Sequence, residues 1–313
     1  NIKAGVIDVD GKVLARVRTE THADKGPETV SDRIADAARQ ALDKAAGRVS
    51  GIGWEQVLGV GVGSPGTIDF DRGVITFSPN LRRMDGFALR DAVSDRLDGA
   101  QVVLENDANA AAKGEQWIGA GRDGDSLVML TLGTGIGGGV ILNDQVWHGF
   151  GGGAGELGHM SIDFDGVKCA CGNYGCIEAY ASATNMVRRM KETIASGVQS
   201  SLADEGESIT AKRIHEAAVA GDEPARENIE RTGRYLGVAI TNILHMFNPK
   251  VVALGGGVTG AGTMLMDPLL DEVQNRVLQM CYEGVDIRFA ELGEDAGFIG
   301  AAGCALVLLG PEQ

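Results

Sequence analysis

The chain has 313 residues, enough for about two domains and a sizeable buried core. It carries 28 Lys and Arg residues against 43 Asp and Glu residues, and the formal net charge of −15 argues against a basic face for nucleic acid or for an anionic membrane. No apolar stretch reaches the ~18–20 residues of a spanning helix and no cleavable leader is visible, so we expect a soluble, cytoplasmic protein. Glycine is over-represented, with 47 residues, which indicates loops where the backbone approaches a ligand.

The first third of the chain predicts a hairpin, a long helix and two buried strands. Asp10-Gly11 is a two-residue turn signal, and Pro27 opens a helix in which apolar residues recur at helical spacing. The second buried strand ends in Asn106-Asp107, after which small residues favour a helix. The ranges predicted for these elements are 4–8, 13–17, 27–47, 57–63, 102–105 and 108–113.

A second hairpin pattern follows, in which a strand passes through a glycine-rich turn into another strand. The later part of the chain alternates helices with strands. The predicted ranges are a strand at 126–132, a turn at 133–139, a strand at 140–142, helices at 204–216 and 224–247, a strand at 251–254, a helix at 264–280, a strand at 285–290 and a helix at 297–309. Because a hairpin followed by helices and strands occurs twice, we expect two α/β lobes with mixed sheets and a cleft between them.

The glycine-rich turn has the sequence L-G-T-G-I-G-G-G at 132–139 and contains a literal G-x-G-x-x-G. Dinucleotide binding requires a helix after these glycines, whereas here a strand and the turn Asn143-Asp144 are predicted. A hairpin turn that offers backbone N–H groups to phosphate fits better, and a merely flexible turn is the third interpretation. A similar match at 61–66 is weaker because Pro65 removes one backbone donor.

Polar residues end the strand at 102–105, in the run E-N-D-A-N-A-A-A at 105–112. Asn106 or Asp107 could simply cap the following helix. Capping needs only one such residue, however, and the carboxyl ends of strands are where sites of α/β proteins lie. A carboxylate there could accept a proton from a substrate hydroxyl, so capping and a functional site both remain open.

A candidate metal site follows the motif G-E-L-G-H at 155–159. The spacing from His159 to Cys169, Cys171 and Cys176 is His-x9-Cys-x-Cys-x4-Cys. One imidazole and three thiolates complete a tetrahedral Zn²⁺ shell, which indicates structural zinc, and the alternative is four unrelated loop residues.

The remaining cysteines and histidines give no functional signal. We expect Cys281 and Cys304, both on predicted helices, to be core residues. Four histidines have no partner visible in the sequence and are assigned no role: His22, His148, His215 and His245.

Five motifs occur in one order: those at 105–112, 132–139 and 155–159, then C-x-C-G-x-x-G-C at 169–176 and L-G-G-G-V at 254–258. Together they resemble the ROK family of sugar kinases and sugar-responsive repressors, most closely its zinc-containing bacterial glucokinases. The resemblance covers essentially the whole chain, and the cysteine signature is its most specific part. It implies the two-lobed actin-like ATPase (ribonuclease H-like) fold. The expected small lobe comprises residues 1–107 and 298–313, and the large lobe with the zinc loop comprises 108–297.

The resemblance implies an enzyme that transfers phosphate from ATP, with Mg²⁺, to the 6-hydroxyl of a hexose, with glucose as the first choice. Asp107 would be the general base that accepts the hydroxyl proton. Asn106 would hydrogen-bond neighbouring sugar oxygens, and Gly66 and Asn80 would line the sugar from the small lobe. The family is commonly dimeric, so a homodimer is expected.

In the large lobe, the same resemblance implies that Glu156, His159 and Glu178 hold the hydroxyls on the anomeric side of the sugar. His159 would also ligate zinc together with the three clustered cysteines. The nucleotide would be held by two glycine turns, with Thr134 and Gly135 at the phosphates and Gly256 and Gly257 near the adenosine.

One departure from the family pattern concerns the start of the sequence. The family has a strand and an acidic-glycine phosphate loop, D-x-G-G-T, just before the N-I-K-A-G match at 1–5. Without them, a sheet strand and half of the phosphate cradle would be missing, and little kinase activity is expected. Three alternatives stay open: an N-acetylmannosamine, mannose, fructose or allose kinase of this family, a sugar-sensing transcriptional regulator without its DNA-binding part, and a dinucleotide-dependent oxidoreductase.

Overall fold

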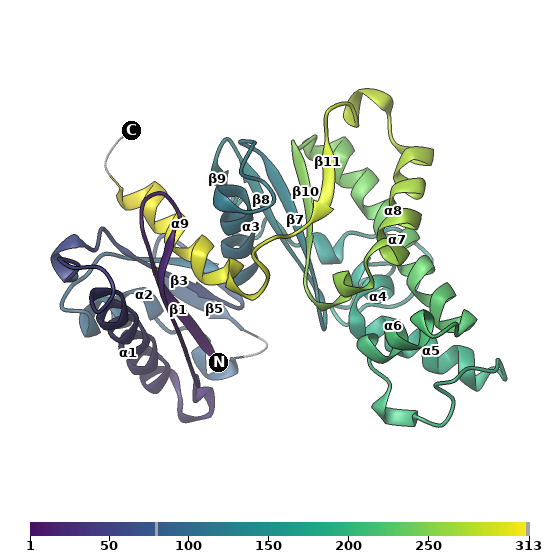
Figure 1. Ribbon diagram of the computed structural model, residues 1–313, viewed down its shortest axis with the longest axis horizontal. Coiled ribbons are helices and arrows are strands. Elements are labelled where there is room, and N and C mark those ends of the chain that lie inside the picture. Colours follow the sequence, from purple (N-terminus) through teal and green to yellow (C-terminus); the bar gives the residue numbers. More distant parts are fainter. Residues whose placement is uncertain (79–80, 311–313) are drawn as a thin grey trace. The chain divides into compact units, whose positions relative to one another are not determined.

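The computed structural model describes residues 1–78 and 81–310, which form two compact units (Figure 1). The first unit comprises Asn1–Ser126, Gly139–Gly155 and Glu291–Gln313, and the second comprises Leu127–Gly138 and Glu156–Ala290. In the described residues, no helix has both the length and the apolar composition needed to cross a bilayer.

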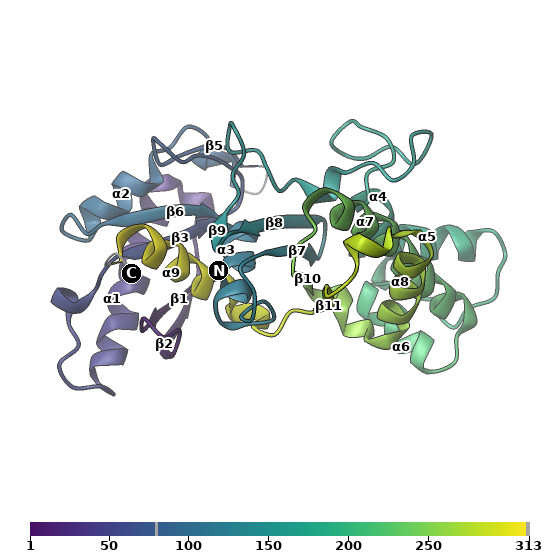
Figure 2. The same ribbon diagram turned by 90° about the horizontal axis from the view of Figure 1, so that it is seen from above.

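The first unit combines short strand pairs with four helices. Two of its antiparallel pairs are β1 (Ile2–Ile7) with β2 (Val13–Thr19) and β4 (Thr67–Asp69) with β5 (Val74–Phe77). Strand β3 (Val60–Ser64) runs parallel to β6 (Val102–Asn106), and Figure 2 shows the two side by side. Its helices are α1 (Pro27–Ala46), α2 (Leu89–Arg96), α3 (Asp107–Ile118) and α9 (Ala296–Leu309).

The second unit is built on parallel strands. Strand β10 (Val251–Gly255) lies between β7 (Leu127–Leu132) and β11 (Asp286–Phe289), parallel to both. Strand β8 (Ile136–Leu142) begins in this unit and ends in the first, where it pairs with β9 (Gln145–Val146), so the sheet order is β11-β10-β7-β8-β9. Strand β10 is buried throughout and β7 at every residue except Thr131, which explains their largely apolar sequences.

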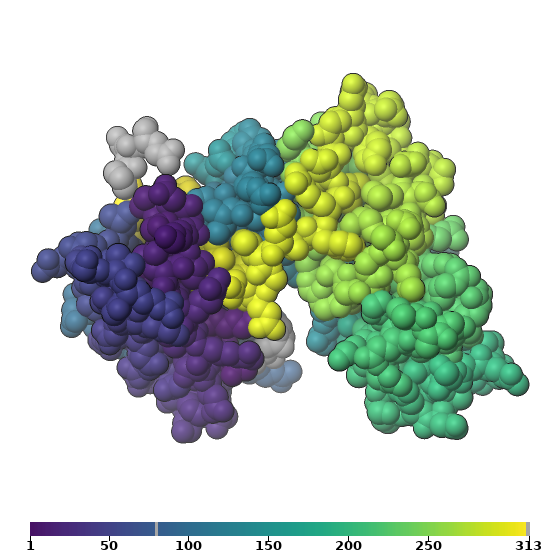
Figure 3. Space-filling view, in the orientation of Figure 1, coloured from purple at the N-terminus to yellow at the C-terminus, as the bar shows by residue number. Residues whose placement is uncertain are grey.

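Five helices complete the second unit: α4 (Glu178–Ala181), α5 (Ala183–Ala195), α6 (Ala211–Val219), α7 (Glu223–Phe247) and α8 (Thr263–Arg276). Helices α5 to α8, coloured green to yellow-green, form a continuous surface of this unit (Figure 3). The ends of α7 follow from its sequence. The Asp222 carboxylate accepts the Ala225 N–H at 3.0 Å, and Asn248 ends the helix in the left-handed conformation.

Several predicted element boundaries were wrong. Strand β3 begins at Val60 and not at 57, β8 begins at Ile136 and not at 140, and α3 continues to Ile118. The first hairpin has a five-residue loop, because the Asp8 carboxylate accepts the N–H groups of Asp10 and Lys12 and so organises a wider turn than Asp10-Gly11 alone. The helix predicted at 204–216 begins only at Ala211, where Thr210 caps it. The helix predicted at 264–280 ends at Arg276, and the next residues are extended.

Three helices went unpredicted: α2, α5 and the four-residue α4. Helices α2 and α5 each bury only two side chains, Leu89 and Val93 in α2 and Met186 and Met190 in α5, so the apolar stripe in the sequence is short. Helix α4 is too short to show a periodic pattern. Of the cysteines outside the cluster, Cys304 is buried in α9 as expected, whereas Cys281 is half-buried on a short 3-10 turn.

The first unit contains a partly open cavity of about 870 Å³. Strands β1 and β3 both line it, and among the described residues each pairs with one other strand only, β1 with β2 and β3 with β6. The remaining lining is mostly apolar and includes residues of α1 and α9, such as Ile34 and Phe298. Such a lining is a poor match for a sugar, which needs many polar partners, although Asp107 also belongs to it.

Candidate functional site

In the first unit, the predicted site residues gather where β6 meets α3. Asn106 caps α3, because its Oδ1 accepts the N–H groups of Ala108 at 2.9 Å and Asn109 at 3.3 Å. Its Nδ2 donates to the carbonyl of Gly66 at 3.1 Å, so Asn106 and Gly66 are neighbours. Asp107 is the first residue of the helix. The fourth residue predicted here, Asn80, lies outside the described residues.

The Asp107 carboxylate stands on a helix N-terminus beside the capped turn. Surrounding protein displaces water and raises the pKa of Asp107, and the Ala108 N–H, 3.0 Å from Oδ1, partly offsets that rise. The residue is still exposed to solvent, so the carboxylate oxygen that does not accept the Ala108 N–H can contact a ligand. A carboxylate with a raised pKa is a stronger base, which suits proton abstraction from a hydroxyl.

Position 66 requires glycine because of its backbone conformation and because of its close neighbours. Its φ is +112°, and an added Cβ would lie 2.4 Å from the carbonyl oxygen of Phe77. Gly66→Ala should therefore lower the free energy of unfolding by ~1–3 kcal/mol, the cost of backbone strain, plus the cost of the clash. Denaturant unfolding measures this effect. Gly86→Ala is the matched control, because Gly86 has φ +77° but open space around its Cβ position. Equal losses in the two variants would contradict the clash.

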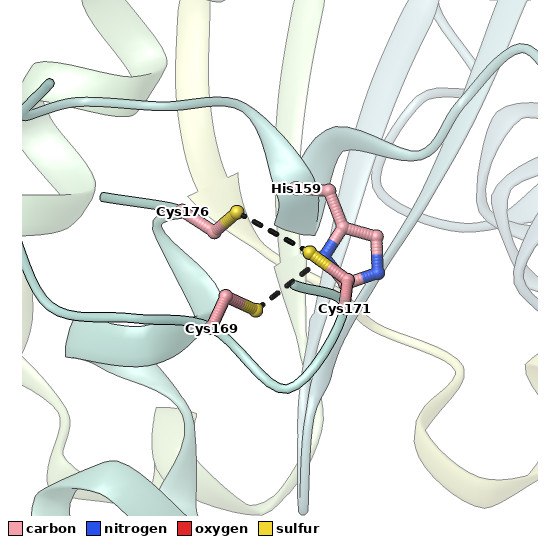
Figure 4. A group of neighbouring side chains, drawn as sticks. All are labelled: His159, Cys169, Cys171 and Cys176. Atoms are coloured by element: carbon pink, nitrogen blue, oxygen red, sulfur yellow. Dashed lines mark hydrogen bonds between the residues drawn. The ribbon is translucent and has the colours of Figure 1, made fainter. Parts of the chain in front are cut away.

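In the second unit, His159 and the three clustered cysteines point toward one another (Figure 4). Their ligand atoms all lie within 4.8 Å of one another. His159 Nδ1 is 3.8 Å from Cys169 Sγ, and Cys171 Sγ is 3.7 Å from Cys176 Sγ. The loop is closed by backbone hydrogen bonds, including Cys169 N–H to the carbonyl of Asn173 at 2.8 Å.

The donor set of this cluster fits a zinc ion. One imidazole and three sulfurs, converging from a closed loop, are the ligands of a structural tetrahedral site. Burial raises the pKa of Cys169 and raises the pKa of Cys176 to about 12, whereas a backbone N–H at Asn173 lowers the pKa of Cys171. A cation would stabilise the thiolates against this burial, so its binding would release protons.

Glu178 connects this cluster to the glycine turn after β7. Its Oε2 accepts the Ile136 N–H at 2.9 Å, and its Oε1 lies 3.8 Å from Cys169 Sγ. Glu156, also predicted to bind sugar, is mostly exposed, with Oε2 4.0 Å from His159 Nε2. Of the three residues expected to hold sugar hydroxyls, His159 therefore belongs to the Cys3His cluster, and Glu156 and Glu178 border it.

The two glycine turns predicted to hold a nucleotide lie side by side in the second unit. They follow the parallel strands β7 and β10, whose residues Leu130 and Leu254 are in register. At Gly256, φ is +94° and an added Cβ would lie 2.4 Å from the Leu132 carbonyl oxygen, so only glycine allows this approach. Carboxyl ends of neighbouring parallel strands are the usual place for a ligand in α/β folds.

The turn at 133–135 is followed by strand β8 and not by a helix, as the hairpin interpretation predicted. Its conformation is fixed from α5, because Ala183 N–H donates to the Gly133 carbonyl at 2.9 Å and Thr184 Oγ1 donates to the Thr134 carbonyl at 2.7 Å. These anchoring residues carried no signal in the sequence. His148 was also assigned no role, yet its Nε2 lies 2.8 Å from Glu105 Oε2.

These features define an α/β protein with glycine turns at strand ends and a Cys3His cluster whose donor set fits a metal ion. The chain belongs to the ROK family, whose family model matches residues 1–307. It is 38% identical to a glucokinase of Thermotoga maritima over 95% of the chain and 92% of the relative. It is also 33% identical to a xylose repressor of Bacillus subtilis, over 78% of the chain and 60% of the relative.

Solved structures give the same family and the same fold. A ROK hexokinase from Thermus thermophilus superimposes with a TM-score of 0.80 at 32% identity, covering 98% of this chain and 99% of that one. A ROK family glucokinase from Streptomyces griseus, in complex with glucose and AMPPNP, superimposes with a TM-score of 0.73 at 34% identity. The match covers 95% of this chain and 93% of that one. The predicted actin-like ATPase fold with mixed sheets is thereby confirmed.

Proposed function

We propose that the chain transfers the γ-phosphoryl group of ATP to the 6-hydroxyl of a hexose, with glucose as the preferred acceptor. That the chain is a sugar kinase rests on its family and on glucokinases that are 33–38% identical to it. Transfer from ATP to the 6-hydroxyl is supported by the carboxylate at the start of α3 and by the glycine turns after β7 and β10.

Asp107 is the proposed general base for the acceptor hydroxyl. Its raised pKa and its free oxygen support this role, and the Asn106 cap holds the turn that carries it. Asn106 and Gly66 are proposed to contact the sugar, together with Asn80. A sugar presents many hydroxyls, so fixed amide and carboxylate partners can reject analogues that lack one of them.

The second unit is proposed to supply the remaining sugar contacts and the nucleotide site. Glu156, His159 and Glu178 would accept and donate hydrogen bonds to hydroxyls. The backbone N–H groups at Thr134 and Gly135 suit phosphate, and Gly256 and Gly257 suit close approach of the adenosine. Mg²⁺ would bridge the ATP phosphates and neutralise charge during transfer.

Zinc is proposed to have a structural role. His159, Cys169, Cys171 and Cys176 would hold it, leaving no open position for substrate. The ion would stiffen the loop from which Glu178 reaches both Cys169 and the Ile136 N–H. Zinc would thus preorganise sugar and phosphate contacts without taking part in the chemistry.

A coupled ADP-release assay on the full-length protein tests this function. The acceptors are glucose, mannose, fructose, N-acetylmannosamine and allose, each with Mg-ATP. We expect the highest kcat/KM with glucose. A higher value with another sugar would overturn the glucose assignment, and no ADP release with any of these acceptors would overturn the kinase assignment.

A regulator is the second candidate, because the xylose repressor of Bacillus subtilis matches 78% of this chain. The net charge of −15 and the carboxylate at Asp107 favour the kinase. Sugar binding without turnover, combined with DNA retention by the full-length protein at moderate salt, would favour the regulator. The homodimer, the cytoplasmic location and the lobe boundaries at 107/108 and 297/298 stay predictions.

A further inference from the structure

Glu105 is a buried acid to which the proposed mechanism gives no role. It is 3% exposed and lies two residues before Asp107, near the end of β6. Its Oε1 accepts the Asn106 N–H at 2.8 Å and the Asn109 Nδ2–H at 3.0 Å. Its Oε2 lies 2.8 Å from His148 Nε2, and because a carboxylate only accepts, Nε2 carries the proton of this bond.

His148 is itself fixed from two sides. Its ring packs on Phe70, with ring centroids 3.9 Å apart and planes inclined at 39°. Its carbonyl accepts the Ala154 N–H at 3.0 Å, which closes the glycine-rich loop that begins at Gly149. The His148 side chain is 32% exposed whereas that of Glu105 is 4% exposed, so the hydrogen bond links a buried acid to a partly exposed imidazole.

The hydrogen bonds of Glu105 determine the shape of the turn at Asp107. A buried carboxylate oxygen without a partner is costly, so loss of the His148 N–H would drive Glu105 to seek another donor. That movement would break its bond to the Asn106 N–H or to Asn109. Both residues belong to the cap of α3, where Asn106 also reaches Gly66.

We propose that His148 is a positioning residue for Asp107 and acts through Glu105. The chain of contacts runs from the Phe70 ring to the His148 imidazole, then to the Glu105 carboxylate and the Asn106 N–H. This inference rests on the proposed function, because the role of Asp107 as base is what makes its position matter for the rate. His148 touches no reacting atom in this account.

Two substitutions separate the hydrogen bond of His148 from its packing. His148→Phe keeps a ring against Phe70 but removes the N–H, whereas His148→Gln keeps a donor and removes the ring. We expect His148→Phe to lower kcat by ~10–10²-fold, the effect of a small misplacement of a catalytic group. KM for sugar and ATP should change little, and His148→Gln should recover most of kcat.

The opposite result, a lowered kcat in His148→Gln and a normal kcat in His148→Phe, would overturn the proposal and assign His148 a packing role only. Equal kcat in both variants and the wild type would overturn it as well. His245→Phe is the control: it removes a histidine whose Nε2 accepts the Leu278 N–H at 3.0 Å in the second unit, and kcat should not change.

Hydrogen exchange keeps the inference testable if the kinase assignment fails. The amides of Asn106, Ala108 and Asn109 should exchange faster in His148→Phe than in the wild type, and His148→Gln should restore the slow rate. Unchanged exchange in His148→Phe would contradict the positioning role. Absence of turnover in the wild type would instead contradict the proposed function alone.

Discussion

Replacing Asp107 by asparagine should lower kcat by ~10²–10⁴-fold, the range for loss of a general acid–base group. The expected loss is confined to turnover, because an asparagine Oδ1 can still accept the Ala108 N–H that lies 3.0 Å from the native carboxylate. The cap of α3 by Asn106 is also unaffected. Sugar affinity, measured by calorimetry without ATP, should therefore stay close to that of the wild type while ADP release falls.

Asp10→Asn is the matched control for this experiment. Asp10 is an exposed acid in the loop between β1 and β2, and the same change of charge there should leave kcat unaltered. A kcat of Asp107→Asn within tenfold of the wild type would remove Asp107 from the role of base. Loss of sugar binding in parallel with turnover would indicate a binding role instead.

Replacing Cys171 by serine should abolish zinc binding and weaken hexose binding. Cys171 is the exposed member of the cluster, so the serine creates no cavity, whereas Cys176 is fully buried. Structural zinc contributes ~10–16 kcal/mol of binding free energy in zinc-finger peptides, and the loss of one of four ligands forfeits much of it. Elemental analysis should show zinc in the wild type and little in the variant, with a lower Tm and a raised KM for the sugar.

Cys281→Ser provides the control, because Cys281 is a half-buried cysteine outside the cluster. It should retain zinc, and its KM should match the wild type. Wild-type protein without zinc would contradict the structural role of the metal. Full zinc content in Cys171→Ser would show that Cys171 is not a ligand.

The parts of the structure that the sequence predicted depend on local patterns. The long helix α7 has a proline near its start, a capping Asp222 and a periodic apolar stripe, and its predicted and observed ranges agree within one residue. The approach of His159 to the three cysteines could also be predicted, because all four lie in one short glycine-rich segment. Where the local pattern was weak, as in α2 and α5, the helices were missed.

The pairing of Glu105 with His148 could not be predicted from the sequence. The two residues are 43 positions apart, and no spacing rule connects the end of a strand with a distant loop. The run at 105–112 left capping and a functional site open, and the structure shows that Asn106 does cap α3. The role of Asp107 can still be tested, because only Oδ1 of its carboxylate accepts the Ala108 N–H and the other oxygen is available to a ligand.

The most direct test of the central claim is to identify the reaction product. The full-length protein is incubated with glucose and Mg-ATP, and the products are followed by phosphorus and proton NMR. We predict ADP and glucose 6-phosphate in equal amounts, with the new phosphorus signal coupled to the two protons on C6. ADP with inorganic phosphate alone, or a phosphate ester at any other carbon, would contradict the assigned transfer to the 6-hydroxyl.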